Sequence, residues 1–322
     1  MADILYKDKE TFSKIIKEMR FSYLRISITS DCNAHCSFCH NEGQKLGLRD
    51  KAAQQQQTIL SNQQYAHIAD FFKPFFSKVL FTGGEPTIVE NLPDIVSIFK
   101  NAGYLTKITS NGISLTPSLQ LKLMHAGLDE INISLHTLDK DQYAKMFGVD
   151  NALPSVLKNI SFLSSTFPDK VKFNFMGLLN DNIPSQLVPM SQLSARYHIP
   201  ISFLTTLNFK NKNQLLSDIV KEELVHLLGT PTIKTLPSKF GERYFYTYSN
   251  GAIWEFDDFR TQEYREDALN NKYCKRCTKN DQCIEGPYAL RVTNTGTLKP
   301  CIIRNDNTLP LFRGQSLFKS ER

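Results

Sequence analysis

The chain has 322 residues, of which 41% are hydrophobic and 22% are charged, a composition typical of an ordinary globular protein. Residues 1–20 are charged and lack the apolar stretch of a signal peptide, and no run of about 18 apolar residues predicts a transmembrane helix, so we expect a cytoplasmic protein without membrane association. The net charge of +6 is spread along the chain without a Lys/Arg block, which favours a solvated surface or a pocket for an anionic substrate over nucleic-acid binding.

The first predicted elements are a helix over residues 10–19 within an N-terminal helical segment, 1–20, and a strand over 23–29 that is rich in apolar and β-branched residues. A cysteine-containing loop follows this strand directly. Residues 45–57 are polar, include four consecutive glutamines, and predict a flexible insertion, or alternatively a mobile lid, before the next helix.

From residue 78 onward, short apolar strands alternate with amphipathic helices. The predicted strands are 78–82, 105–109, 130–135, 171–178 and 201–206, and the predicted helices are 92–102, 118–126, 142–147 continuing over 155–165, and 184–197. With the first strand this gives six parallel strands, which right-handed crossovers curl into a partial (β/α)6 barrel of the TIM type over residues 1–210. Loops after the strands carry the site in such folds.

After residue 210 the alternation stops, and residues 211–322 predict a smaller C-terminal module. Residues 221–228 favour a helix, and 242–248 with 252–256 favour a hairpin around Asn250-Gly251, since Asn-Gly suits a tight turn. Four of the seven cysteines lie in this module.

The cysteines divide into two groups with none between. The first group is Cys32, Cys36 and Cys39, and the second is Cys274, Cys277, Cys283 and Cys301. An odd number in a chain without a signal peptide argues against a disulfide framework, and the partition favours metal or cluster ligands.

The loop Cys32-Asn33-Ala34-His35-Cys36-Ser37-Phe38-Cys39 has ligand spacing for a [4Fe–4S] cluster. Such a cluster normally takes four thiolates, so three on one tight loop leave one iron open, and an open coordination position is typical of a catalytic metal site. Two alternatives remain: a zinc site completed by His35 or His40, and a structural cluster completed from elsewhere in the chain.

A second motif, Gly83-Gly84-Glu85, follows the strand over 78–82. Paired glycines allow a backbone to approach a ligand closely, and a carboxylate beside them can bind an ammonium group. Both motifs follow strands of one parallel sheet, so we expect them on the same edge of the barrel.

These motifs resemble those of the radical S-adenosylmethionine (SAM) superfamily, whose CxxxCxφC loop has an aromatic residue at φ, here Phe38. The resemblance implies a [4Fe–4S] cluster that binds the methionine amine and carboxylate of SAM, and one-electron cleavage of SAM to a 5′-deoxyadenosyl radical. An electron donor such as flavodoxin or ferredoxin is implied as a partner. The implied cofactor-binding residues are Phe38, Gly83, Gly84, Glu85, Thr109, Ser110, Asn111 and Ser134.

Within the superfamily the sequence is most similar to the branch containing the GTP 3′,8-cyclase of molybdenum-cofactor biosynthesis. Segments 24–29, 108–112 and 126–135 carry this similarity. The similarity implies an auxiliary-cluster module in which Cys274, Cys277 and Cys301 hold a second [4Fe–4S] cluster. Cys283 departs from the pattern as a fourth thiolate that would saturate this cluster, and a zinc site on the same four cysteines is the alternative.

Departures from the branch predict that the substrate is not GTP. Ser202 and Ala289 stand where the branch has arginine, and the chain ends without the C-terminal Gly-Gly of the cyclases. The substrate-binding candidates are Arg25, His136, Lys172, Glu285, Tyr288 and Arg291; ordinary ion pairing is the alternative role for Arg25 and Lys172.

The sequence therefore predicts a radical SAM enzyme that abstracts hydrogen from a small polar molecule, such as a nucleotide or sugar derivative. The outcome would be rearrangement, cyclisation, decarboxylation or dehydrogenation. Modification of a ribosomal peptide is the first alternative, although no peptide-recognition domain is evident. A non-catalytic iron–sulfur or zinc protein is the second, and it leaves residues 83–85 unexplained.

Overall fold

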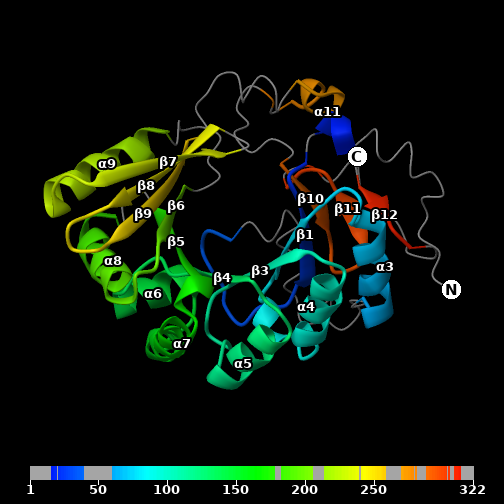
Figure 1. Cartoon of the computed structure of the whole chain (residues 1–322), viewed down its shortest axis with the longest axis horizontal. Coiled ribbons are helices and arrows are strands. Elements are labelled where there is room, and N and C mark those ends of the chain that lie inside the picture. Colours follow the sequence, from blue (N-terminus) through cyan, green and yellow to red (C-terminus); the bar gives the residue numbers. More distant parts are fainter. Residues whose placement is uncertain are drawn as a thin grey trace.

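One curved β-sheet runs through the computed structural model, and its twelve described strands follow the order β12-β11-β10-β1-β2-β3-β4-β5-β6-β9-β8-β7 (Figure 1). The structure describes residues 16–19, 21–39, 60–177, 183–205, 214–238, 241–258, 270–278, 280, 288–302, 304 and 308–312.

Six parallel strands in chain order form the centre of the sheet. They are β1 (Tyr23–Thr29), β2 (Lys78–Gly83), β3 (Leu105–Ser110), β4 (Glu130–Ser134), β5 (Val171–Gly177) and β6 (Ile201–Thr205). The helices are α3 (Asn62–Phe72), α4 (Leu92–Asn101), α5 (Pro117–His125), α6 (Lys140–Phe147), α7 (Leu153–Thr166), α8 (Ile183–Tyr197), α9 (Gln214–Leu228) and the short α11 (Lys272–Lys275), with 3-10 turns at η3 (Pro86–Ile88) and η4 (Pro168–Lys170). The expectation of a partial (β/α)6 barrel is confirmed.

Helices α3 to α9 lie in an arc outside the strands (Figure 1). Alternate strand residues face this outer layer and are fully buried, as Ile108, Ile131 and Phe173 are. The residues between them, such as Lys107 and Lys172, face the concave side and are only partly buried. Period-two alternation thus separates an apolar outer face, which packs against helices, from a polar inner face.

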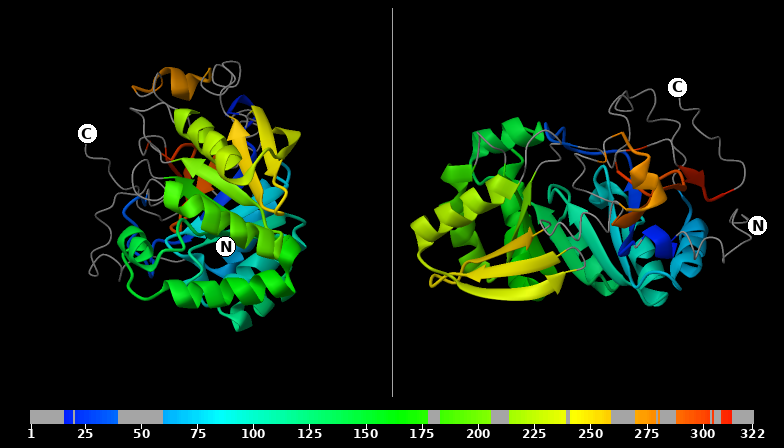
Figure 2. Two further views of the ribbon diagram at one scale, coloured as in Figure 1. Left: turned by 90° about the vertical axis from the view of Figure 1, so that its left-hand side faces the viewer. Right: turned by 90° about the horizontal axis from the view of Figure 1, so that it is seen from above.

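The strands after residue 210 extend both edges of the central sheet. On one side β9 (Ile253–Asp258) pairs in parallel with β6 and continues antiparallel to β8 (Gly241–Thr247) and β7 (Thr232–Ser238). On the other side β10 (Ala289–Val292) pairs in parallel with β1, followed by β11 (Thr297–Lys299) and β12 (Leu309–Pro310). The two extensions lie at opposite ends of the molecule (Figure 2).

The predicted hairpin around Asn250-Gly251 is confirmed, because β8 and β9 pair from Thr247 opposite Ile253 outward, and Gly251 has a φ of +88°. The division of the chain at residue 210 stays a prediction. Of the predicted helix over 10–19, only 16–19 are described, as helix. The polar stretch 45–57 lies outside the described residues.

Candidate functional site

The first cysteine group lies on the loop that leaves β1, at the carboxyl end of the parallel strands. Cys32, Cys36 and Cys39 are half-buried, and each is a thiol rather than half of a disulfide. The loop is anchored on α6, because the amides of His35 and Ser37 donate hydrogen bonds to the carbonyls of Phe147 (2.7 Å) and Met146 (3.0 Å). The last turn of α6 therefore positions the loop.

The paired glycines let the β2–η3 turn run directly against this cysteine loop. A Cβ on Gly84 would lie 2.0 Å from the carbonyl oxygen of Asp31, and one on Gly83 would lie 2.2 Å from that of Thr29. The Gly84 amide donates to the Thr29 carbonyl (2.7 Å), and the Glu85 amide donates to the Asp31 carbonyl (2.8 Å). Both glycines therefore have a clear steric role toward the chain's own backbone.

Glu85 joins the ends of β2 and β3. Its side chain is 2% exposed, and one carboxylate oxygen accepts hydrogen bonds from the Ser110 hydroxyl (2.7 Å) and from the amide and hydroxyl of Thr87, while the other accepts from the Asn111 amide (2.8 Å). Burial raises the pKa of Glu85, and the donated hydrogen bonds work to lower it. Both oxygens are occupied by donors of this chain, so Glu85 is fixed in place and organises the two loops.

Asn111 continues these contacts to the cysteine loop. Its side-chain amide donates to the Asn33 side-chain oxygen (2.8 Å) and lies 4.0 Å from the Cys32 sulfur, while its own oxygen accepts from the Ile113 amide (2.9 Å). A continuous set of contacts therefore runs from Glu85 through Asn111 to Cys32. Thr109 and Ser134, on β3 and β4, are half-buried on the same sheet.

An aromatic cluster packs against the cysteine loop from the side of α6. Phe38 contacts His136 edge-on (centroids 5.0 Å apart), His136 stacks on Phe147 (5.4 Å), and Phe147 stacks on Tyr143 (4.2 Å). Burial lowers the pKa of His136 to about 4, although its contact with the Asn174 carbonyl works to raise it, so the imidazole is neutral at pH 7. Its Nδ1 accepts from the Met176 amide (3.1 Å).

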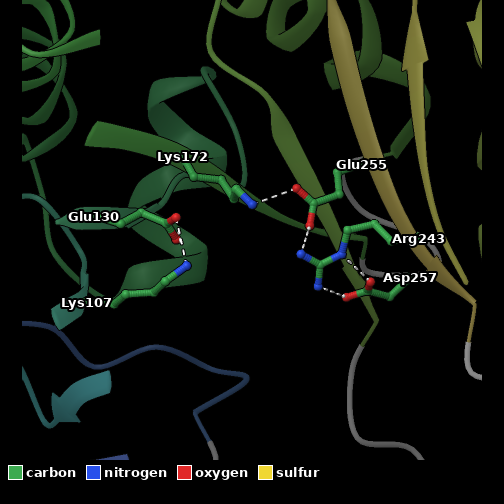
Figure 3. Close-up of polar contacts among 6 residues, drawn as sticks. All are labelled: Lys107, Glu130, Lys172, Arg243, Glu255 and Asp257. Atoms are coloured by element: carbon green, nitrogen blue, oxygen red, sulfur yellow. Dashed lines mark hydrogen bonds and ion pairs between the residues drawn. The ribbon is translucent and has the colours of Figure 1, made fainter. Parts of the chain in front are cut away.

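The substrate-binding candidates do not all meet at one point. Lys172 on β5 forms an ion pair with Glu255 on β9 (2.7 Å), the alternative role considered for it (Figure 3). Arg25 lies opposite Arg291 in the β1–β10 register, and the Arg291 guanidinium lies 5.4 Å from the Tyr288 ring centre. Glu285 lies outside the described residues.

The second cysteine group is described in part. Cys274 and Cys277 form one turn, in which the Cys277 amide donates to the Cys274 carbonyl (2.9 Å), and Cys301 follows β11. These three thiols are half-buried. Cys283 lies outside the described residues.

The donor set of the first loop fits a [4Fe–4S] cluster, because three thiols of one short segment can each bind a different iron. Within the described ranges, no three His, Cys, Asp or Glu side chains converge where one metal ion could bind.

No helix in the described part of the chain is long and apolar enough to cross a bilayer.

Sequence reasoning did not single out Tyr143, Phe147, Arg243, Glu255 or Asp257. The i, i+4 spacing of Tyr143 and Phe147 on a short helix was a detectable signal for a shared face. The partners of Lys172 gave no such signal, because β9 joins β6 from a distant part of the chain.

The model of the radical SAM superfamily matches residues 26–185. A probable GTP 3′,8-cyclase of Thermococcus kodakarensis is 30% identical over 298 residues, covering 89% of this chain and 86% of that protein, and one of Thermoplasma volcanium is 28% identical over 302 residues, covering 90% and 82%. Among solved structures, Streptococcus suis SuiB bound to precursor peptide SuiA is similar with a TM-score of 0.61 at 15% identity, covering 91% of this chain but only 63% of SuiB.

Fold, cysteine loop and relatives together define an enzyme that works with an iron–sulfur cluster on a partial barrel. The chain belongs to the radical SAM superfamily. Membership implies a [4Fe–4S] cluster and SAM as its cofactors.

Proposed function

We propose that this enzyme binds its [4Fe–4S] cluster through Cys32, Cys36 and Cys39, cleaves SAM reductively, and abstracts hydrogen from a small polar substrate at the inner face of the barrel. The observation that carries the proposal is the position of the three-thiol loop. It leaves β1 at the carboxyl edge of the sheet, and both the Gly83-Gly84 turn and α6 hold it there.

When bound, the cluster and SAM supply a 5′-deoxyadenosyl radical; the residues of the chain orient the reactants and exclude water. Phe38 would lie beside the adenine, since it is packed edge-on against His136 and Phe147. The backbone around Gly83 and Gly84 would bind the methionine amino group. Ser134 and Thr109, which are half-buried, would contact the rest of SAM, with Glu85 fixing Ser110 and Asn111.

A second cluster on Cys274, Cys277 and Cys301 is part of the proposal, with Cys283 as its fourth ligand. The turn that brings Cys274 and Cys277 together supports it. A flavodoxin or ferredoxin would supply the electron. Zinc at the second site is the alternative, and metal analysis separates the two.

Anaerobic reconstitution tests these assignments. We expect about eight irons per chain and 5′-deoxyadenosine formed from SAM under a strong reductant, with about four irons and no SAM cleavage in a Cys32→Ala/Cys36→Ala variant. Four irons with one zinc would replace the second cluster by a zinc site. An iron-loaded protein that leaves SAM intact under strong reductant would refute the proposed function.

GTP cyclisation is a second candidate function. Relatives named probable GTP 3′,8-cyclase align with about nine tenths of the chain at 28% to 30% identity, which favours it. Ser202 on β6 and Ala289 on β10 argue against it, because neither side chain can neutralise a phosphate. Incubation of the reduced holoenzyme with SAM and GTP separates the candidates: a cyclised nucleotide establishes the second, and 5′-deoxyadenosine without a GTP-derived product leaves the first.

A further inference from the structure

A cluster of six charged side chains lies on the inner face of the sheet, away from the cysteine loop's own contacts. Three are cations and three are carboxylates, so the cluster carries no net charge (Figure 3). Its members are Lys107 on β3, Glu130 on β4, Lys172 on β5, Arg243 on β8, and Glu255 and Asp257 on β9. We call these six residues the inner charge cluster.

Glu255 is the centre of this cluster. Its side chain is 2% exposed, and each of its carboxylate oxygens contacts a different cation: Oε2 lies 2.7 Å from Lys172 Nζ and Oε1 lies 3.0 Å from Arg243 Nη1. Neighbouring Trp254 and Phe256 face the opposite side, where the Trp254 indole donates to Ser191 on α8 (2.9 Å). Alternation along β9 therefore fixes Glu255 on the inner face.

Asp257 holds the second cation in place. Arg243 donates to both Asp257 oxygens, from Nε (2.6 Å) and from Nη2 (3.0 Å), a bidentate geometry that also fixes the plane of the guanidinium. Burial works to lower the pKa of Arg243, but Asp257 and Glu255 outweigh it and raise that pKa. Arg243 is therefore charged and already paired with Asp257 and Glu255, so it is not available to a ligand.

These contacts decide which substrates the inner face accepts. A polyphosphate bound at this end of the inner face would draw on Lys172 and Arg243, and this would leave Glu255 buried without a cation. Separating a buried carboxylate from its cations is unfavourable, so we expect it to lower the affinity for such an anion by at least about tenfold. A neutral or zwitterionic group can bind beside the intact pairs without that cost.

We infer that Glu255 is a specificity-determining residue, which withholds Lys172 and Arg243 from anions and selects a substrate without a polyphosphate group. The inference rests on the proposed function for its site, and it separates this enzyme from one that acts on GTP. Arg25 and Arg291 lie in register on β1 and β10, toward the other end of the sheet, and are not the ion-pair partners of Glu255.

The test measures binding of inorganic tripolyphosphate and of GTP to the reconstituted holoenzyme, with saturating SAM, by equilibrium dialysis. We expect weak binding by the wild type and at least about tenfold tighter binding by Glu255→Gln, which releases two cations. Glu130→Gln is the matched control, since it removes the same charge but releases only Lys107, whose pair is more exposed (29% and 24%). We expect its gain to be about twofold or less, because exposed pairs are weak.

Equal gains in both variants would reduce the effect to net charge and overturn the inference. Tight wild-type binding that Glu255→Gln leaves unchanged would overturn it too, because the anion would then bind without drawing on the partners of Glu255. If Glu255→Gln does not fold, micromolar binding of tripolyphosphate by the wild type alone overturns it. SAM cleavage is measured separately, so loss of the proposed function and loss of this inference have different signatures.

Discussion

Gly84→Ala places a methyl group where the cysteine loop runs. Its Cβ would lie 2.0 Å from the Asp31 carbonyl oxygen, whereas real Cβ contacts stay above 3.0 Å, so the loop or the turn must move by at least 1.0 Å. That movement also strains the hydrogen bond from the Glu85 amide to Asp31 (2.8 Å). A displacement of about 1 Å at a reacting centre can cost about a hundredfold in rate, so we expect a fall of about that size in SAM cleavage.

The assay is anaerobic reconstitution followed by iron analysis and quantification of 5′-deoxyadenosine. We expect lower iron occupancy as well as slower cleavage in Gly84→Ala. The control is Gly229→Ala, because an added Cβ there would meet nothing within 4 Å, although Gly229 has a left-handed φ of +85° that Gly84 lacks. This control therefore includes backbone strain but no steric clash. Iron content and cleavage within twofold of the wild type in Gly84→Ala would refute the steric reasoning.

Three other substitutions test the surroundings of the loop. Burial lowers the pKa of His136 from 6.5 to about 4, so between these pH values the unfolded chain binds a proton that the folded chain does not bind. The free energy of unfolding therefore falls by up to about 3 kcal/mol on acidification across that window. Urea unfolding of His136→Phe at several pH values should show a flatter profile, and an unchanged profile would contradict this cause. Glu85→Gln turns an amide NH2 toward one of the donors that Glu85 now accepts from, so we expect a loss of about 1–3 kcal/mol in the free energy of unfolding, and equal or higher stability would show that the carboxylate is not the organising group. Phe147→Ala should lower the free energy of unfolding by about 3–5 kcal/mol and also lower the iron content of the reconstituted protein. Phe99 is as buried as Phe147 but lies away from the cysteine loop, so Phe99→Ala should cost similar stability and keep its iron. Equal iron losses in the two variants would contradict the role of α6 in positioning the loop.

Local patterns in the sequence predicted the partial barrel and the location of the site at the carboxyl ends of its strands. The strand boundaries closely follow runs with apolar residues at alternate positions, β-branched or Leu at β1 and mostly aromatic at β5. The cysteines and paired glycines come at the ends of strands whose parallel order brings them to one edge. The resemblance to the superfamily then indicated the chemistry. The structure adds a physical reason for Gly84, which is contact with Asp31 rather than the ligand alone.

Long-range strand pairing was the part that sequence could not predict. Residues after 210 were expected as one appended module, and nothing local indicates that β9 pairs with β6 while β10 pairs with β1. The ion-pair partner of Lys172 could not be predicted for the same reason, because Glu255 comes close to Lys172 only through the β6–β9 pairing. Pairings between distant segments depend on packing and not on local propensity.

The β1–β10 pairing also sets the order in which the protein can be completed during synthesis. Tyr23 pairs with Ala289, so the strand that leads into the cysteine loop keeps an open edge until residue 289 has left the ribosome. An unpaired edge of an apolar strand is a template for association with other chains. Nascent chains must therefore be protected at β1, and a chain shortened before residue 289 would be expected to aggregate rather than to yield a smaller active enzyme.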